Sequence, residues 1–204
     1  FNAGYGTSAE VHTGYTFVSQ SMRYRFSPKL DVTITGEMVR DNNNIGFAYY
    51  NDALLEPVVG RRDVRQYTAE LNCKLNLGPN TNFTARFRHY NAFIHYLDFF
   101  LVDETGEWRT RPQPYQSGHD ENFNLQNVDV FFNWIFKPGS RFVLSYKQWL
   151  NDAYLLNDQM ENSYFNNLFR FVKVPHAYEV SARVILFLDY NQMKEKSKGP
   201  KPLG

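Results

Sequence analysis

Residues 132–149 read FNWIFKPGSRFVLSYKQW, two alternating runs joined by a Pro-Gly pair. Apolar side chains recur at every second position on both sides of the pair: Phe132, Trp134 and Phe136, then Phe142, Leu144 and Tyr146. A period of two places these side chains on one face of an extended strand and the intervening polar ones on the other. Because Pro-Gly is a turn signal, the stretch predicts an antiparallel hairpin with one apolar and one polar face.

The same period governs most of the chain. Residues 66–77 split completely, with apolar side chains at odd positions and polar ones at even positions. Similar alternation predicts seven strands, near residues 11–26, 30–42, 62–77, 81–100, 122–136, 140–152 and 175–191. The connections between these strands alternate between short and long. The short ones are Ser27-Pro28-Lys29, Gly78-Pro79-Asn80 and Lys137-Pro138-Gly139, and the long ones lie at about 43–61, 101–121 and 153–174.

The alternation also predicts the register of the hairpins. Residues directly opposite one another in an antiparallel pair point to the same face. Polar residues stand at odd positions in both strands around Pro138, so the loop there has an odd length. A three-residue loop is the simplest choice, and it favours a type I turn followed by a G1 bulge. This register places Asp129 opposite Lys147 and Glu70 opposite Arg88.

Composition limits the classes of function. A chain of 204 residues forms one large domain or two small ones. The net charge of +1 argues against nucleic acid as a partner. The single cysteine, Cys73, excludes an internal disulfide and a thiolate metal cluster. No apolar run approaches the roughly 18 residues of a transmembrane helix.

Two interpretations of the apolar face compete. In a soluble β-barrel or sandwich the apolar face points inward, and the protein binds an apolar small ligand. In a transmembrane barrel it points to lipid. Strands of 10–15 alternating residues, with short turns at one end and long loops at the other, are typical of the second class. Aromatic residues near both ends resemble two interfacial girdles: Phe26, Phe136 and Phe142 beside the short turns, and Tyr90, Phe93, Tyr96 and Phe99 toward a long loop.

The expected fold is therefore all-β, an antiparallel up-and-down transmembrane β-barrel in the bacterial outer membrane, with a transport or envelope-anchoring role. Short turns and the C-terminus are expected in the periplasm, and long loops outside the cell. Residues 1–192 are expected to form the strands and loops, and residues 193–204 a disordered tail. Eleven charged residues are predicted to line the lumen: Arg23, Arg25, Glu37, Glu70, Lys74, Arg86, Arg88, Asp129, Lys147, Glu179 and Arg183.

Seven strands do not close a bacterial barrel, which has an even number and no open edge. Residues 1–10, FNAGYGTSAE, are short and Gly-rich and are not assigned as a strand. We therefore expect the C-terminal portion of a larger barrel, closed by upstream segments of the same protein. The expected partners are these segments, the lipid bilayer and, as candidates, other envelope proteins.

Two stretches resemble a known family. Residues 58–100 are similar to the C-terminal barrel of a large group of outer-membrane proteins of Bacteroidetes-type bacteria. There a Gly-Arg-Arg-Asp start, here residues 60–63, leads to a strand ending in Arg-His-Tyr, here residues 88–90. Residues 119–149 resemble a hairpin of the same family, with counterparts at Asn122, Phe123, Asn124, Trp134, Pro138, Gly139 and Ser140.

The resemblance covers most of residues 58–191 and implies a domain of unknown function. In that family the barrel often follows a module resembling a family-9 carbohydrate-binding domain. None of the quoted residues belongs to that module, so no carbohydrate role is transferred. The family supplies no catalytic residues either.

No chemistry of catalysis or metal binding is predicted. His89 and His95 fall on one strand face about 20 Å apart, too far to share a metal. The acidic residues around one long loop lack the ligand spacing of a calcium site: Asp103, Glu104, Asp120 and Glu121. No Gly-x-Ser-x-Gly motif and no Ser-His-Asp spacing occurs, so no enzyme activity and no cofactor is assigned.

Two segments have simple interpretations. Cys73 is expected to act as a small hydrophobic residue on the apolar face. Tyr164, Leu168 and Phe171 have nearly helical spacing. They fit either a short covering helix or the irregular start of the last strand.

Overall fold

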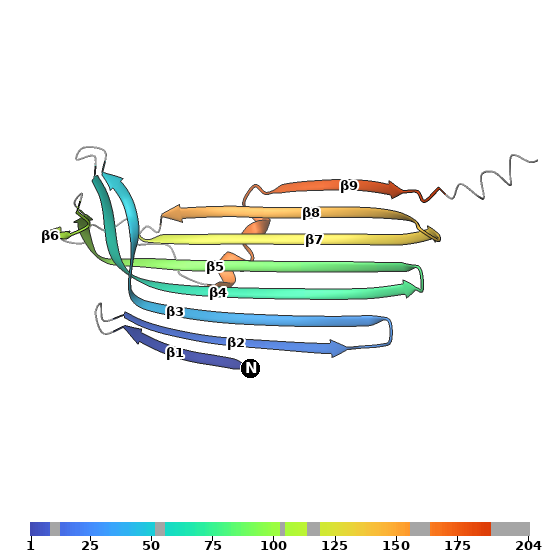
Figure 1. Cartoon of the computed structure of the whole chain (residues 1–204), viewed down its shortest axis with the longest axis horizontal. Coiled ribbons are helices and arrows are strands. Elements are labelled where there is room, and N and C mark those ends of the chain that lie inside the picture. The colour runs from blue at the N-terminus through green and yellow to red at the C-terminus, as the bar shows by residue number, and fades with distance from the viewer. Residues whose placement is uncertain (9–12, 52–55, 103–104, 114–118, 156–163, 189–204) are drawn as a thin grey trace, which may run out of the picture.

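The computed structural model describes residues 1–8, 13–51, 56–102, 105–113, 119–155 and 164–188. They form one antiparallel sheet in which strands follow one another in chain order, β1-β2-β3-β4-β5-β7-β8-β9, while β6 pairs on β5. The strands are β1 (Asn2–Ser8), β2 (Thr13–Arg25), β3 (Leu30–Asn51), β4 (Glu56–Gly78), β5 (Thr81–Val102), β6 (Trp108–Gln113), β7 (Glu121–Lys137), β8 (Ser140–Leu155) and β9 (Ala177–Ile185). The all-β antiparallel class is confirmed. The described sheet is open, with β1 and β9 at opposite edges (Figure 1).

The prediction of seven strands missed two, β6 in the long loop expected at 101–121 and β1 at the N-terminus. All seven residues of β1 pair with β2, in the segment that had looked too Gly-rich for a strand. Gly4 lies opposite Phe17, whose ring occupies the space of a side chain, because a Cβ on Gly4 would lie 2.2 Å from the ring. An aromatic ring laid across a glycine on the neighbouring strand compensates for the missing side chain.

Three neighbouring strands are also longer than the alternation predicted. β3, β4 and β5 contain 22, 23 and 22 residues, about 70 Å at the usual rise per residue. Most of the loop expected at 43–61 is therefore strand, interrupted by register shifts between Asp41 and Asn44 and between Phe47 and Tyr49. Asn43 adopts a φ of 56° within the first shift, and its N–H donates to Asp63 Oδ1 at 2.9 Å. Such bulges break the period of two, which explains why the pattern was lost there.

The last strand and the tail differ from expectation too. β9 ends at Ile185, and residues 186–188 carry no strand pairing. At this point Phe187 leaves the sheet edge and donates its backbone N–H to the Ser140 hydroxyl at 2.9 Å. The expected tail at 193–204 lies outside the described residues.

The predicted pairs are confirmed, but the predicted turn type is wrong. Asp129 lies opposite Lys147, and Glu70 opposite Arg88. The hairpin at Pro138 closes with a two-residue tip, and the odd residue is absorbed by a register shift between Trp134 and Lys137. Gly139 has a φ of 75°, which suits the third position of a type II turn rather than a type I turn.

The far ends of β3–β5, opposite the short turns, pack into a small core around Val58, Tyr96 and Phe99. The rings of Tyr96 and Phe99 stack with centroids 5.3 Å apart, and both side chains are buried. Phe93 is buried as well. The second aromatic girdle, predicted from Tyr90, Phe93, Tyr96 and Phe99, is therefore wrong, because three of these rings fill the protein interior.

The segment after β8 is helical, which settles the open choice at residues 164–171. Helix α1 (Tyr164–Leu168) is followed by a 3-10 turn, η1 (Arg170–Val172), before β9 begins. Among the described residues, no helix is long and apolar enough to cross a membrane.

Candidate functional site

The register places all eleven predicted lumen residues on one side of the sheet, called the charged face. One row crosses the sheet without a break: Arg23, Thr33, Asn72, Arg86, Asp129, Lys147 and Glu179. Each residue in this row is the direct partner of the next. Side chains at directly opposite positions interact across strands, so seven strands contribute to one continuous polar row.

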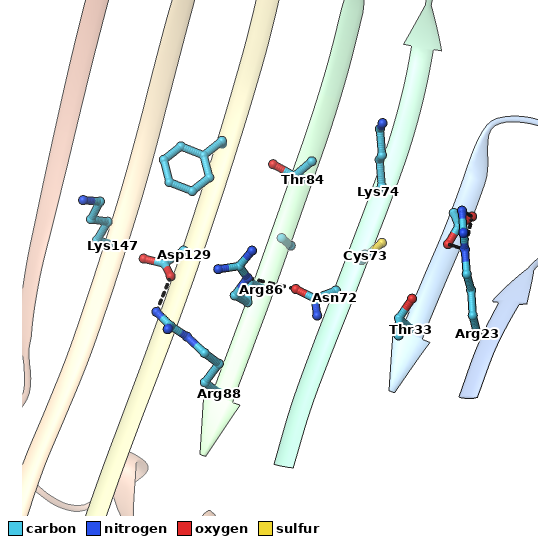
Figure 2. Close-up of a pocket in the computed structure, with 13 residues that line it drawn as sticks. Arg23, Thr33, Asn72, Cys73, Lys74, Thr84, Arg86, Arg88, Asp129 and Lys147 are labelled. Carbon is cyan, nitrogen blue, oxygen red and sulfur yellow. Dashed lines mark hydrogen bonds and ion pairs between the residues drawn. The ribbon is translucent and has the colours of Figure 1, made fainter. Parts of the chain in front are cut away.

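The structure gathers six of the eleven around a groove of about 600 Å³. Figure 2 shows them on neighbouring strands, pointing to the same side of the sheet. The six are Arg23, Lys74, Arg86, Arg88, Asp129 and Lys147. The remaining five, Arg25, Glu37, Glu70, Glu179 and Arg183, lie on the same face outside the lining.

Two residues missed by the prediction organise the groove. Asp31 accepts hydrogen bonds from Arg23 Nε and Nη2 at 2.9 and 2.5 Å, and Arg25 Nε lies 3.7 Å from its carboxylate. Asn72 donates from Nδ2 to Glu70 Oε1 at 2.5 Å and accepts from Arg86 Nε at 2.9 Å. Both residues continue the polar alternation of their strands, and that signal was sufficient to find them.

Acidic partners hold two of the arginines. Arg88 Nη2 lies 3.1 Å from Asp129 Oδ2. Arg86 Nε lies 4.0 Å from Glu70 Oε1, at the limit of an ion pair. Because all four side chains are partly exposed, these contacts orient the guanidinium groups more than they stabilise the fold.

Lys74 and Lys147 form no ion pair within the described part of the chain, although Lys147 faces Asp129 and Glu179 in the register. The groove lining carries five cationic side chains and two carboxylates, a net charge of +3. Counting Glu70, which contacts Asn72 and Arg86, lowers it to +2. The site is therefore cationic in a chain that is nearly neutral.

A second polar site lies on the other side of the sheet, farther from the short turns. Asn167 of α1 reaches into a buried group of amide side chains from β5 and β7, which we call the amide cluster: Asn91, Asn122, Asn124, Gln126 and Asn167. Asn122 Nδ2 donates to Asn167 Oδ1 at 3.0 Å, and Asn167 Nδ2 donates to Asn91 Oδ1 at 3.3 Å. The backbone carbonyl of Asn167 accepts from Asn124 Nδ2 at 3.0 Å and from Gln126 Nε2 at 3.2 Å. The cluster fastens α1 to the sheet.

Neighbouring contacts extend this attachment. His89 Nε2 lies 2.8 Å from Asn124 Oδ1, and the His89 ring packs 5.1 Å from the ring of Tyr164. Arg170 of η1 pairs with Asp152. Burial raises the pKa of Tyr164, which keeps its hydroxyl neutral.

The residues considered for metal binding have other partners. His95 Nδ1 lies 2.7 Å from Asp120 Oδ2, and Asp120 Oδ1 accepts the backbone N–H of Tyr96 at 2.9 Å. Burial raises the pKa of Glu121, an effect that Arg62 and His119 partly oppose. Asp103 and Glu104 lie outside the described residues. Among the rest, no three His, Cys, Asp or Glu side chains converge on a metal position.

A family model described as a domain of unknown function (DUF5916) matches residues 1–197. The chain belongs to this family. No curated protein and no solved structure matches it.

The geometry gives physical roles to the residues that carried the family resemblance of this DUF5916 chain. A Cβ on Gly60 would lie 2.5 Å from the ring of Tyr96, so only glycine leaves room for the far-end core. Asn122 and Asn124 hold α1 through the amide cluster. The sequence marked these positions, but neither their burial nor the helix they bind was predicted, because both partners are distant in sequence.

Proposed function

We propose that this chain is part of the wall of an outer-membrane β-barrel, with the charged face toward a water-filled interior and the opposite, apolar face toward lipid. Its role is solute passage or anchoring in the envelope, without catalysis. The observation that carries the proposal is the exposure of large hydrophobic side chains on the apolar face near the short turns: Met22, Tyr24, Ile34, Leu71, Trp134, Leu144, Tyr178, Val180 and Val184. Met22 and Val184, on distant strands, are each 59% exposed.

An apolar surface with exposed side chains on six strands is much larger than the patches of monomeric soluble proteins. Lipid is the solvent that makes such exposure favourable, and strand alternation with a polar interior is the known solution for barrels. Two cavities lie on the charged face, one lined by the basic groove residues and the other including Arg62 and Gln66. Water on that side satisfies their charges.

The alternative, a soluble β-barrel that binds an apolar ligand, requires the apolar face to line an enclosed pocket. Ile34, Leu144 and Val180 are instead exposed, at 49%, 41% and 64%. We therefore favour lipid over a small ligand as the occupant of this face.

The polarity of β5 indicates how much of the apolar face, counted from the short turns, contacts lipid. On its apolar face Phe83 and Phe87 are followed by His89 and Asn91, which are covered by α1. About 9–11 tilted residues cross a bilayer, which is the distance from Thr81 to this change. Near the same level, the segment formed by α1, Phe169 and η1 exposes the side chains of Phe165, Phe169 and Val172. These side chains suit the outer membrane interface. They stand in place of the aromatic girdle that the sequence predicted from Tyr90, Phe93, Tyr96 and Phe99.

The open sheet requires further strands. The outer edges of β1 and β9 leave backbone groups without ladder partners among the described residues, and unpaired backbone is costly in lipid. We infer that other strands, upstream segments of the same protein, complete the barrel. The short turns lie in the periplasm in this arrangement.

The test uses the full-length protein and two single-cysteine variants in a Cys73→Ser background. Leu144 and Lys147 lie on opposite faces of β8. In intact outer-membrane vesicles, a water-soluble maleimide is expected to label Lys147→Cys and to leave Leu144→Cys unlabelled. A protein that remains in buffer-soluble fractions, or that is labelled at Leu144→Cys alone, contradicts the proposal.

A further inference from the structure

We infer that the basic groove of the charged face is a binding site for anions that carry two or more negative charges, such as phosphate esters or polycarboxylates. The inference rests on the proposed function, because it specifies the solute that the charged face meets. The groove is defined by Arg23, Lys74, Arg86, Arg88 and Lys147, together with Asp31 and Asp129.

The balance of charge is the first argument. A chain with a formal net charge of +1 concentrates a net +3 in one groove. Clefts with an excess of one sign attract mobile ions of the opposite sign and raise their local concentration. Rings of Arg and Lys are the usual lining of pores for anions and phosphate.

The second argument is that the arginines and the lysines of the groove differ in how they are held. Arg86 and Arg88 are held in place by Asn72 and Asp129 through contacts at 2.9 and 3.1 Å. These contacts use only part of each guanidinium group, which carries five N–H donors. The side chains of Lys74 and Lys147 form neither an ion pair nor a hydrogen bond with a described residue, so their ammonium groups are open to a ligand on this part of the chain. The fixed arginines orient a bound anion, and the lysines add positive charge beside it.

The spacing of the cations is the third argument. Arg86 and Lys147 occupy one row and are separated by the strand of Asp129, about 10 Å at the usual distance between strands. Lys74 lies one row nearer the turns than Arg86, on the adjacent strand, about 7–8 Å away as a diagonal neighbour. A small ion such as chloride contacts one of these groups at a time. An anion with two separated charges contacts two or more, and guanidinium groups bind carboxylate and phosphate in bidentate fashion.

The test is calorimetric titration of the full-length protein in detergent with inorganic pyrophosphate and, separately, with citrate. Both anions carry several charges, so either one binding supports the inference, and the tighter of the two assigns phosphate or carboxylate chemistry. The double variant Lys74→Gln/Lys147→Gln is expected to weaken the tighter anion about tenfold or more, as the loss of charge-assisted contacts implies. The variant Lys74→Arg/Lys147→Arg keeps the charge and is expected to retain binding.

A matched control removes the same charge elsewhere. Lys173→Gln/Arg183→Gln changes two cations outside the groove lining and is expected to shift the affinity less than twofold, because exposed charges beyond a Debye length are screened. Absence of binding for both anions in a folded protein overturns the inference, and so does an equal loss in the groove and control variants. A protein that fractionates with the outer membrane yet binds neither anion leaves the proposed function standing, whereas a soluble protein that binds one of them refutes only the proposed function.

Discussion

Removal of the Asn167 side chain is expected to release α1 from the sheet. In the amide cluster this side chain accepts one hydrogen bond from Asn122 and donates to Asn91 and Asn122. Asn167→Ala removes one hydrogen bond from the Asn122 Nδ2 donor and one from the Asn91 Oδ1 acceptor, whereas Asn122 Oδ1 still accepts from Asn91 Nδ2 at 2.7 Å. Each buried polar group that loses its partner costs about 1–3 kcal/mol.

Two such groups give about 2–6 kcal/mol, and water entering beside the shortened side chain favours the lower half of that range. The helix has only five residues, so it retains little structure once undocked. Its last-turn bond, from the Phe169 N–H to the Phe165 carbonyl at 3.1 Å, is a suitable reporter. The amide exchange protection of Phe169 is expected to fall by about thirtyfold or more, since 1.4 kcal/mol corresponds to a factor of ten.

Hydrogen–deuterium exchange by mass spectrometry on the full-length protein in detergent measures this effect. Asn166→Ala is the matched control, because it changes the same residue type at the exposed neighbouring position in α1. Exchange in the β7–β8 hairpin is expected to stay unchanged in both variants. If Asn167→Ala leaves the exchange of Phe169 as slow as in the control, the amide cluster does not hold the helix and the reasoning fails.

Three further substitutions test other parts of the structure. Gly60→Ala is expected to cost about 1–3 kcal/mol through overpacking against the buried Tyr96 ring, while Gly36→Ala, with nothing within 4 Å, is neutral; equal unfolding midpoints in detergent would contradict the account of the far-end core. Burial raises the pKa of Glu121 above its ordinary 4.5, so the stability that this group contributes to the folded state is lost as pH rises through the folded pKa. Glu121→Gln is therefore expected to stabilise the protein near neutral pH and to change its stability little in acid. Melting curves at both pH values measure this, and a larger gain in acid would refute it. Leu144→Arg is expected to cost about 2–4 kcal/mol in lipid vesicles, as an arginine on a lipid face does, whereas Val143→Arg on the charged face costs less; the reverse order in urea unfolding would show that the faces are assigned the wrong way round.

The sequence predicted the features that depend on local alternation. Between residues 66 and 76 each side chain has the face and the partner that the period of two implies, down to the pairing of Glu70 with Arg88. It failed where a distant partner decides the structure. β1 contains two glycines and little hydrophobic surface, yet it pairs fully because Phe17 covers Gly4.

The amide cluster was not predicted from the sequence for a similar reason. Asn91, Asn122 and Asn124 are polar residues at positions where the alternation calls for apolar ones, and alone they look like the end of a strand. Their burial comes from Asn167, which is 76 residues from Asn91 along the chain. No local pattern in the sequence links residues so far apart.

The change of polarity along the apolar face then has a structural explanation. Near the short turns this face carries exposed aliphatic and aromatic side chains such as Ile34 and Leu71. Farther from the short turns, on β5 and β7, it carries amides that are hydrogen-bonded to α1. A sheet that lies entirely in water needs no such change of polarity, because the same solvent contacts the whole face. A sheet that leaves a membrane and continues into water does need it, since backbone and amide groups above the lipid must find protein or water partners. The row of His89 and Gln126, where the switch occurs, is therefore the level at which we place the outer surface of the membrane.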